Sequence, residues 1–289
     1  MIQISNNILK LNIESKGAEI TSLQKDGKEY MWQGEPTVWG KHSPILFPIV
    51  GKLINDQYTH NDKTYHLNQH GFARDCTFVL ESKEESSVCF LLQSSEDTKA
   101  MYPFDFELRV THFLKENRLK TKYEVHNTSN ETMYFSIGGH PAFCCPIEKE
   151  HQRQEYTLRM DDAIDTSSKV LVDGKISSTK EKDVLIDRQY IPLQKDTFQE
   201  DAIIFDPNPF RKATLVHIPT EKEYLAVHFQ GFPSLGLWSK NEDAAFVCIE
   251  PWYGTADYEG HEGELRTKKG ILSLEKGANF SCQYAVAIF

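Results

Sequence analysis

Glu250 is the residue in this sequence best placed to do chemistry. It follows the apolar run Phe246–Ile249 and precedes Pro251. An unbroken apolar run predicts a buried strand, and a glutamate is seldom placed beside one without a partner. Such a carboxylate serves as a general acid or base, or it accepts backbone hydrogen bonds as a structural group. The next two side chains, Trp252 and Tyr253, are suited either to stacking on the flat face of a ligand or to filling the core.

His140 lies in a motif that favours the mouth of a strand. Residues 133–137 alternate apolar and polar side chains, which predicts a strand, and Pro141 is expected to end it. Gly138 and Gly139 come just before His140 and allow backbone angles that other residues resist. A histidine placed there is a candidate proton donor, although many such histidines are structural.

His70 stands in a second motif, Gln69–Asp75, on a loop expected to lead into a strand. Loop histidines of this kind can face a cleft, although a turn glycine beside a hydrogen-bonded histidine is the simpler interpretation. Two cations accompany the motif: Lys52, which follows Gly51, and Arg74. Both are candidate donors to ligand oxygens, although basic side chains usually lie on the solvated surface.

The remaining motifs argue against cofactors and metals. The sequence has no phosphate-binding loop, no GxGxxG, no HExxH and no GxSxG. Neighbouring cysteines at 144 and 145 lack the CxxC spacing of a zinc site. We therefore expect no cofactor and no metal, and we interpret the cysteines as buried free thiols. They are Cys76, Cys89, Cys144, Cys145, Cys248 and Cys282.

Strands with a period of two residues are expected to hold these side chains in place. Residues 9–13, 106–114 and 119–125 alternate strictly, and the last two segments form a predicted hairpin across residues 115–118. Frequent turn signals between short strands favour a β-sandwich or barrel. Helical periodicity is weak, although Asp196–Asp201 has room for one helical turn. Asp201 then precedes a short apolar strand, where it is a candidate ligand-binding carboxylate or only a turn residue.

One domain covering residues 1–289 is expected, because no linker or fixed-period repeat divides the chain. The polar stretch 152–187 is interpreted as surface hairpins and loops. A formal net charge of -10 makes nucleic acid and anionic membranes poor partners. No signal peptide or membrane span is visible, so a cytoplasmic location is expected. The oligomeric state does not follow from the sequence.

Taken in order along the chain, these motifs resemble the aldose 1-epimerase (galactose mutarotase) family. The resemblance covers essentially the whole chain and is greatest for the branch associated with lactose operons. The matching motifs are Gly51-Lys52, Gln69-His70-Gly71, Gly139-His140-Pro141, Asp201-Ala202 and Ile249-Glu250-Pro251.

The resemblance implies an all-β fold, a large twisted β-sandwich with an open cleft on one concave face. It also implies an isomerase that interconverts the α and β anomers of a free sugar without a metal or cofactor. By position, Glu250 matches the general base of the family and His140 the general acid. His70 matches a substrate-binding histidine, and Asp201 matches a carboxylate that holds sugar hydroxyls.

Two departures bear on the choice of sugar. Galactose mutarotases have an arginine where Lys52 stands, and lysine lacks the planar two-point fork of arginine. The residues around His70 are more similar to the hexose-6-phosphate 1-epimerase branch, and Lys52 and Arg74 are candidate ligands of a phosphate group. A hexose and a hexose 6-phosphate are therefore both open as substrates.

Two other functions remain open from the residues alone. A glycoside hydrolase would pair Glu250 with Asp201 or Asp257, because hydrolysis needs two carboxyl groups flanking one bond. That function leaves both histidines unexplained. A non-catalytic sugar-binding module on the same fold is the third interpretation, since a fold does not fix a function.

Overall fold

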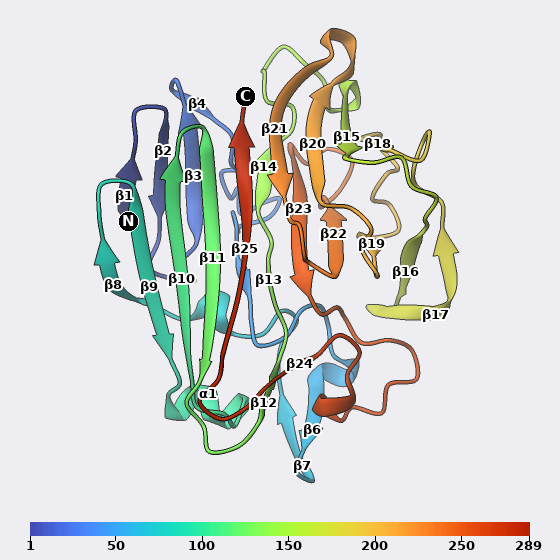
Figure 1. The fold of residues 1–289 in the computed structure, drawn as a ribbon. Coiled ribbons are helices and arrows are strands. Elements are labelled where there is room, and N and C mark those ends of the chain that lie inside the picture. The colour runs from blue at the N-terminus through green and yellow to red at the C-terminus, as the bar shows by residue number, and fades with distance from the viewer.

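The computed structural model describes residues 1–289, which form antiparallel sheets with very little helix (Figure 1). The larger main sheet has nine strands, and the hairpin predicted across residues 115–118 lies within it. Its order is β18 (Tyr190–Pro192), β15 (Tyr156–Met160), β20 (Lys212–His217), β21 (Lys222–His228), β25 (Asn279–Ile288), β11 (Arg118–Asn127), β10 (Phe106–Lys115), β9 (Ser87–Gln93) and β8 (Val79–Lys83).

The second main sheet has eight strands and carries the motifs around His140 and Glu250. Its order is β17 (Lys175–Lys182), β16 (Ser168–Val172), β19 (Ile203–Phe205), β22 (Ser234–Trp238), β23 (Phe246–Tyr253), β13 (Ile137–Gly139) and β5 (Ile45–Leu46), and β14 (Ala142–Cys144) also pairs with β23.

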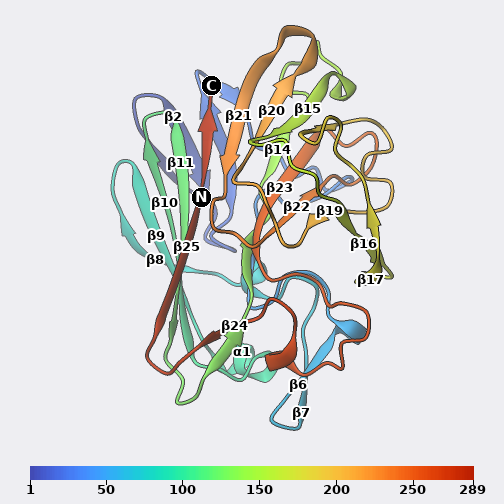
Figure 2. The ribbon, with the colours of Figure 1, turned by 45° about the vertical axis from the view of Figure 1, so that its right-hand side comes forward.

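Smaller elements surround these sheets (Figures 1 and 2). The N-terminal sheet joins β1 (Ile2–Ser5), β2 (Leu9–Ile13), β3 (Ile20–Lys25) and β4 (Lys28–Glu29), while β6 (Gln57–His60) pairs with β7 (Lys63–His66) and β12 (Met133–Phe135) with β24 (Leu272–Leu274). The single α-helix is α1 (Glu96–Met101), and the 3-10 turns are Ile54–Asp56, Ala73–Asp75, Arg153–Glu155, Ile218–Thr220 and Leu265–Thr267. No helix of this chain is long and apolar enough to cross a membrane.

The two main sheets pack face to face around one apolar core. Alternate residues of β10 and β11 are buried, as their sequence period predicts. Gly139 of β13 lies against the other sheet, where a Cβ atom on it would come within 3.0 Å of Tyr123 on β11 and of Tyr284 on β25. The largest core cluster holds 61 buried apolar residues from both sheets. The predicted fold, a large twisted β-sandwich, is confirmed.

One local prediction was wrong, one was right only in part, and one helix was not predicted. The only α-helix begins after Ser95, whose hydroxyl accepts from the Thr98 amide, and the weak periodicity of six residues hid it. The stretch Asp196–Asp201 forms turns and no helix. Within the polar segment 152–187, β16 and β17 form a hairpin that is mostly exposed or half-buried, as predicted. β15 is instead largely buried and joins the nine-stranded sheet, because its side chains pack against the core between neighbouring strands.

Candidate active site

Sheet register places His140 opposite Glu250. β14 pairs Ala142 with Cys248, and the same antiparallel register, continued by two residues, sets His140 across from Glu250. The neighbouring strand is interrupted at His140 and Pro141, between the end of β13 and the start of β14. Directly opposed residues project from the same face of a sheet. The break therefore allows the His140 ring to contact the Glu250 side chain in the middle of β23.

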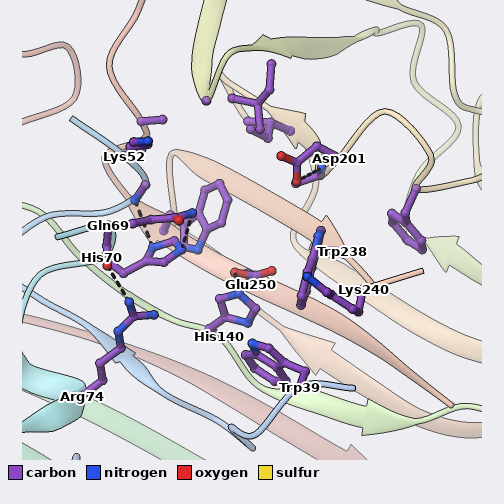
Figure 3. Close-up of a pocket in the computed structure, with 18 of the residues that line it drawn as sticks. Trp39, Lys52, Gln69, His70, Arg74, His140, Asp201, Trp238, Lys240 and Glu250 are labelled. Atoms are coloured by element: carbon purple, nitrogen blue, oxygen red, sulfur yellow. Dashed lines mark hydrogen bonds and ion pairs between the residues drawn. The ribbon is translucent and has the colours of Figure 1, made fainter. Parts of the chain in front are cut away.

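His140 and Glu250 form a buried acid–base pair (Figure 3). His140 Nε2 lies 3.2 Å from Glu250 Oε2, and the two side chains are 9% and 1% exposed. The two atoms are close but form no hydrogen bond, so Glu250 Oε2 has no hydrogen-bond partner, and the other ring nitrogen of His140, Nδ1, has none either. Buried polar atoms without partners are uncommon, and in a cleft they suit a ligand that supplies the missing bonds.

Burial sets the protonation of this pair. It raises the pKa of Glu250 well above its usual value; the charge of Asp201 adds to the shift and the Trp252 indole opposes it. Burial likewise lowers the pKa of His140. Both shifts favour a pair with one proton and no net charge in which Glu250 is the carboxylic acid and His140 the neutral imidazole. Moving that proton to His140 gives the carboxylate–imidazolium form of the same pair.

His70 is held in one tautomer by the neighbouring loop. The backbone N–H of Gly51 donates to His70 Nδ1 at 3.1 Å, so the ring proton is assigned to Nε2. Burial lowers the pKa of His70 well below its usual value, and the charges of His140 and Arg74 act in the same direction. His70 also has a left-handed backbone, with φ of 68°, which is uncommon for a non-glycine residue and is often found at functional sites. Because the pKa of His70 is lowered and Nδ1 accepts a hydrogen bond, the ring is neutral and Nε2–H is its hydrogen-bond donor.

A buried ion pair anchors the loop that carries Gly51. Lys268 Nζ lies 2.7 Å from Asp257 Oδ1, and both side chains are 1% exposed. The other carboxylate oxygen of Asp257 accepts from Ile54 N at 2.9 Å, and its backbone N–H donates to Lys52 O at 2.9 Å. These bonds fix the loop at Lys52 and at Ile54. They also occupy Asp257, which was one of the two carboxylates considered for a hydrolase.

All six residues predicted from the motifs line one cleft of about 540 Å³. In Figure 3, Glu250 lies just above His140, with His70 to the left and Asp201 further above. The six are Lys52, His70, Arg74, His140, Asp201 and Glu250.

The polar residues around the pair differ in how freely they can meet a ligand. Lys52 is half-exposed, and its nearest carboxylate, Asp56, is 4.0 Å away. Asp201 is exposed, and one of its carboxylate oxygens accepts from the Ala202 N–H at 2.8 Å. Arg74 is more committed, because its guanidinium donates to Gln69 O at 2.7 Å.

Three tryptophans shape the walls and floor of the cleft. Trp39 stacks on the His140 ring with centroids 5.0 Å apart, and Trp238 meets the same ring edge-on at 5.7 Å. Trp252 lies flat on the sheet, because its ring covers Gly138 and Gly236, where a Cβ atom would come within 2.7 Å and 2.3 Å of the indole. Rings of this kind suit stacking against a ligand.

Two corrections concern these residues. Gly138 and Gly139 do not have positive φ angles, so the reason for glycine is space for Trp252 and for the opposite sheet rather than unusual backbone angles. The sequence motifs also missed Trp39, Trp238 and Lys240, which line the cleft. Trp238 lies near Glu250 because it pairs with Cys248, two residues before Glu250 on β23. That strand register is set by the tertiary structure, so no sequence motif pointed to Trp238.

Comparison with known proteins agrees with this architecture. The sequence profile of the family described as aldose 1-epimerase matches residues 1–273. The chain belongs to the aldose 1-epimerase family. Among curated relatives of this family member, the chromosomal LacX protein of Lactococcus lactis subsp. lactis is 34% identical over 262 residues, covering 88% of this chain and 87% of LacX.

Solved structures of family relatives share the whole fold. A galactose mutarotase related enzyme from Lactobacillus acidophilus has a TM-score of 0.94 and 36% identity, covering 100% of this chain and 97% of that one. A galactose mutarotase-like protein from Lactobacillus casei has a TM-score of 0.91 and 32% identity, covering 100% of both chains.

Proposed function

We propose that this family member is an aldose 1-epimerase that interconverts the α and β anomers of a hexose by acid–base ring opening. The observation that carries the proposal is the His140–Glu250 pair, 3.2 Å apart and buried in the cleft. Each half of the reaction removes a proton from one oxygen on the anomeric carbon and delivers a proton to the other. A pair that holds one proton can do both, because one member takes a proton while the other gives one.

The side-by-side arrangement suits the substrate atoms. The C1 hydroxyl and the ring oxygen are attached to the same carbon, so a neighbouring base and acid can reach both of them. We assign the reaction to the carboxylate–imidazolium form of the pair, in which Glu250 is the base that takes the C1 hydroxyl proton and His140 is the acid that protonates the ring oxygen. The ring opens, the C1–C2 bond rotates, and the same two groups act in reverse as the ring closes on the other face of the aldehyde.

His70 fits a binding role better than an acid role. Its Nδ1 accepts from Gly51 N–H, so the ring is neutral and carries its proton on Nε2, which lies 3.3 Å from the Gln69 side-chain amide and faces the cleft. We assign it, together with the Asp201 carboxylate, to the sugar hydroxyls, where they orient the ring. Trp39 and Trp238 supply apolar faces beside His140.

The test is anomer exchange measured by NMR or polarimetry on a panel of free and 6-phosphorylated aldoses. An enzyme-dependent rate above the spontaneous rate, lost in Glu250→Gln, is the expected result. Sugar binding without any rate increase would support the non-catalytic module instead. Release of a free sugar from a glycoside would support a hydrolase, for which only Asp201 remains as an available second carboxylate.

A hexose 6-phosphate is the second candidate substrate, favoured by the cations of the cleft. Lys52 and Lys240 lie on opposite sides of Glu250, and Lys240 has no carboxylate within 4.0 Å (Figure 3). Arg74 is less available than the sequence suggested, because it already donates to Gln69 O. We therefore expect Lys52 or Lys240 to contact a phosphate group if one is recognised.

Comparison of kcat/KM for glucose and glucose 6-phosphate at several salt concentrations separates the two substrates. Phosphate recognition predicts a preference for the phosphorylated sugar that weakens as salt screens the attraction. Lys52→Ala or Lys240→Ala then removes the preference while turnover of glucose persists. Equal or better use of glucose by the unmodified protein would leave the neutral hexose as the substrate.

A further inference from the structure

A cysteine that the proposed reaction does not use lies beside the acid–base pair. Cys248 is two residues before Glu250 on β23, so both side chains project from the same face of the sheet. Its neighbours across the sheet are Ala142 on β14 and Trp238 on β22. The Cys248 side chain is fully buried, beneath the cleft that Glu250 lines.

Three different ligand types converge at this point. One ring nitrogen of His140, the sulfur of Cys248 and one carboxylate oxygen of Glu250 lie within 4.8 Å of one another. Zn²⁺ binds sulfur at about 2.3 Å and nitrogen or oxygen at about 2.0–2.2 Å, so its tetrahedral ligands lie roughly 3.5 Å apart. His140 Nε2 and Glu250 Oε2 are already 3.2 Å apart, so the Cys248 sulfur is the atom that has to approach, by about 1 Å.

A second observation also points to a ligand here. Glu250 Oε2 is buried without a hydrogen-bond partner, and so is His140 Nδ1 on the far side of the ring. His140 Nε2 lies 3.2 Å from this oxygen without forming a hydrogen bond to it, so the oxygen keeps a free lone pair at a site that also offers an imidazole and a sulfur.

We propose that His140, Cys248 and Glu250 form a binding site for a thiophilic divalent cation, of which Zn²⁺ fits best. Thiolate and imidazole ligands favour zinc over the hard cations Mg²⁺ and Ca²⁺. Two anionic ligands balance the charge of the ion, and the thiol and carboxyl protons are released to solvent on binding. Three protein ligands leave the fourth position open toward the cleft.

Bound Zn²⁺ would inhibit the enzyme. This consequence rests on the proposed function, because the ion uses the lone pairs with which Glu250 and His140 move protons. Inhibition is expected to follow zinc occupancy and to be reversed by a chelator. Mg²⁺ at the same concentration is expected to have no effect, because it prefers oxygen ligands.

Calorimetric titration of chelator-treated full-length protein with Zn²⁺ tests the site without relying on activity. We expect one ion per chain, with affinity reduced at least about tenfold in Cys248→Ala. Epimerisation by Cys248→Ala should persist and become insensitive to zinc. The matched control is Cys282→Ala, which removes a buried thiol from the other sheet and should bind zinc as the unmodified protein does.

Co²⁺ gives a second measurement, made on variants shown by circular dichroism to be folded, that reports on the thiolate ligand directly. A thiolate–Co²⁺ charge-transfer band should form in the unmodified protein and be absent in Cys248→Ser, which keeps the size of the side chain. Absence of zinc binding, or equal affinity in Cys248→Ala, would overturn the proposal. Cysteine-dependent binding in a protein that epimerises no sugar would establish the site and refute the proposed function instead.

Discussion

Replacing Glu250 with Gln should abolish most epimerisation and leave the fold intact. Gln has the same shape as Glu but cannot take a proton, and deleting a positioned base costs about 10²–10⁴-fold in rate. This corresponds to about 2.7–5.4 kcal/mol of transition-state stabilisation, at about 1.36 kcal/mol for each tenfold change. Sugar binding should persist in part, because His70 and Asp201 remain.

The effect on stability has a definite sign. Burial raises the pKa of Glu250, so its contribution to stability is full below the usual glutamate pKa of about 4.3 and is lost as pH rises toward the folded-state value. A Gln that cannot ionise avoids this loss. Glu250→Gln should therefore be at least as stable as the unmodified protein at neutral pH.

The assay is anomer exchange by NMR, with urea denaturation of the same samples at pH 7. Glu262→Gln is the control, because Glu262 is exposed and does not line the cleft. Near-normal turnover in folded Glu250→Gln would remove Glu250 from the mechanism. A large loss of stability would show that Glu250 is a structural carboxylate.

Three further predictions follow from the site and the core. His140→Asn should lower kcat far more than it raises KM, whereas His70→Asn should raise KM as well as lower kcat; the opposite pattern in steady-state kinetics would mean that the two roles are exchanged. Asp201→Asn should shift the pH profile of kcat/KM to lower pH, because the charge of Asp201 raises the pKa of Glu250. Asp201→Glu keeps the charge and should leave the profile in place. An unshifted profile in Asp201→Asn would show that this charge does not act on the pair. Burial lowers the pKa of His112 to about 4, so its contribution to stability is full above about pH 6.5 and falls by about 3 kcal/mol as pH drops toward 4. His112→Gln should therefore flatten the dependence of the free energy of unfolding on pH in this range, measured by urea denaturation. An unchanged dependence would contradict the assignment.

Local patterns in the sequence determined the class of fold and most members of the site. Strict alternation along residues 106–114 and 119–125 predicted the strands and their hairpin, because in a strand the side-chain period is two and one face must be buried. The motifs around His70, His140 and Glu250 identified the chemically capable residues, because turn glycines, prolines and a carboxylate next to an apolar run can be recognised in the sequence. Taken in order along the chain, the same motifs are those of the aldose 1-epimerase family.

Only the tertiary structure decided how those residues work together. His140 and Glu250 are 110 positions apart, and nothing local specifies the register that sets them 3.2 Å from each other. The loop whose Gly51 N–H fixes the His70 tautomer is hydrogen-bonded, at Lys52 and Ile54, to Asp257, more than 200 residues further along the chain. Pairing over such separations depends on the packing of whole sheets. The protonation states of His140 and Glu250, and the position of the Cys248 thiol beside them, could therefore not be predicted from motif spacing.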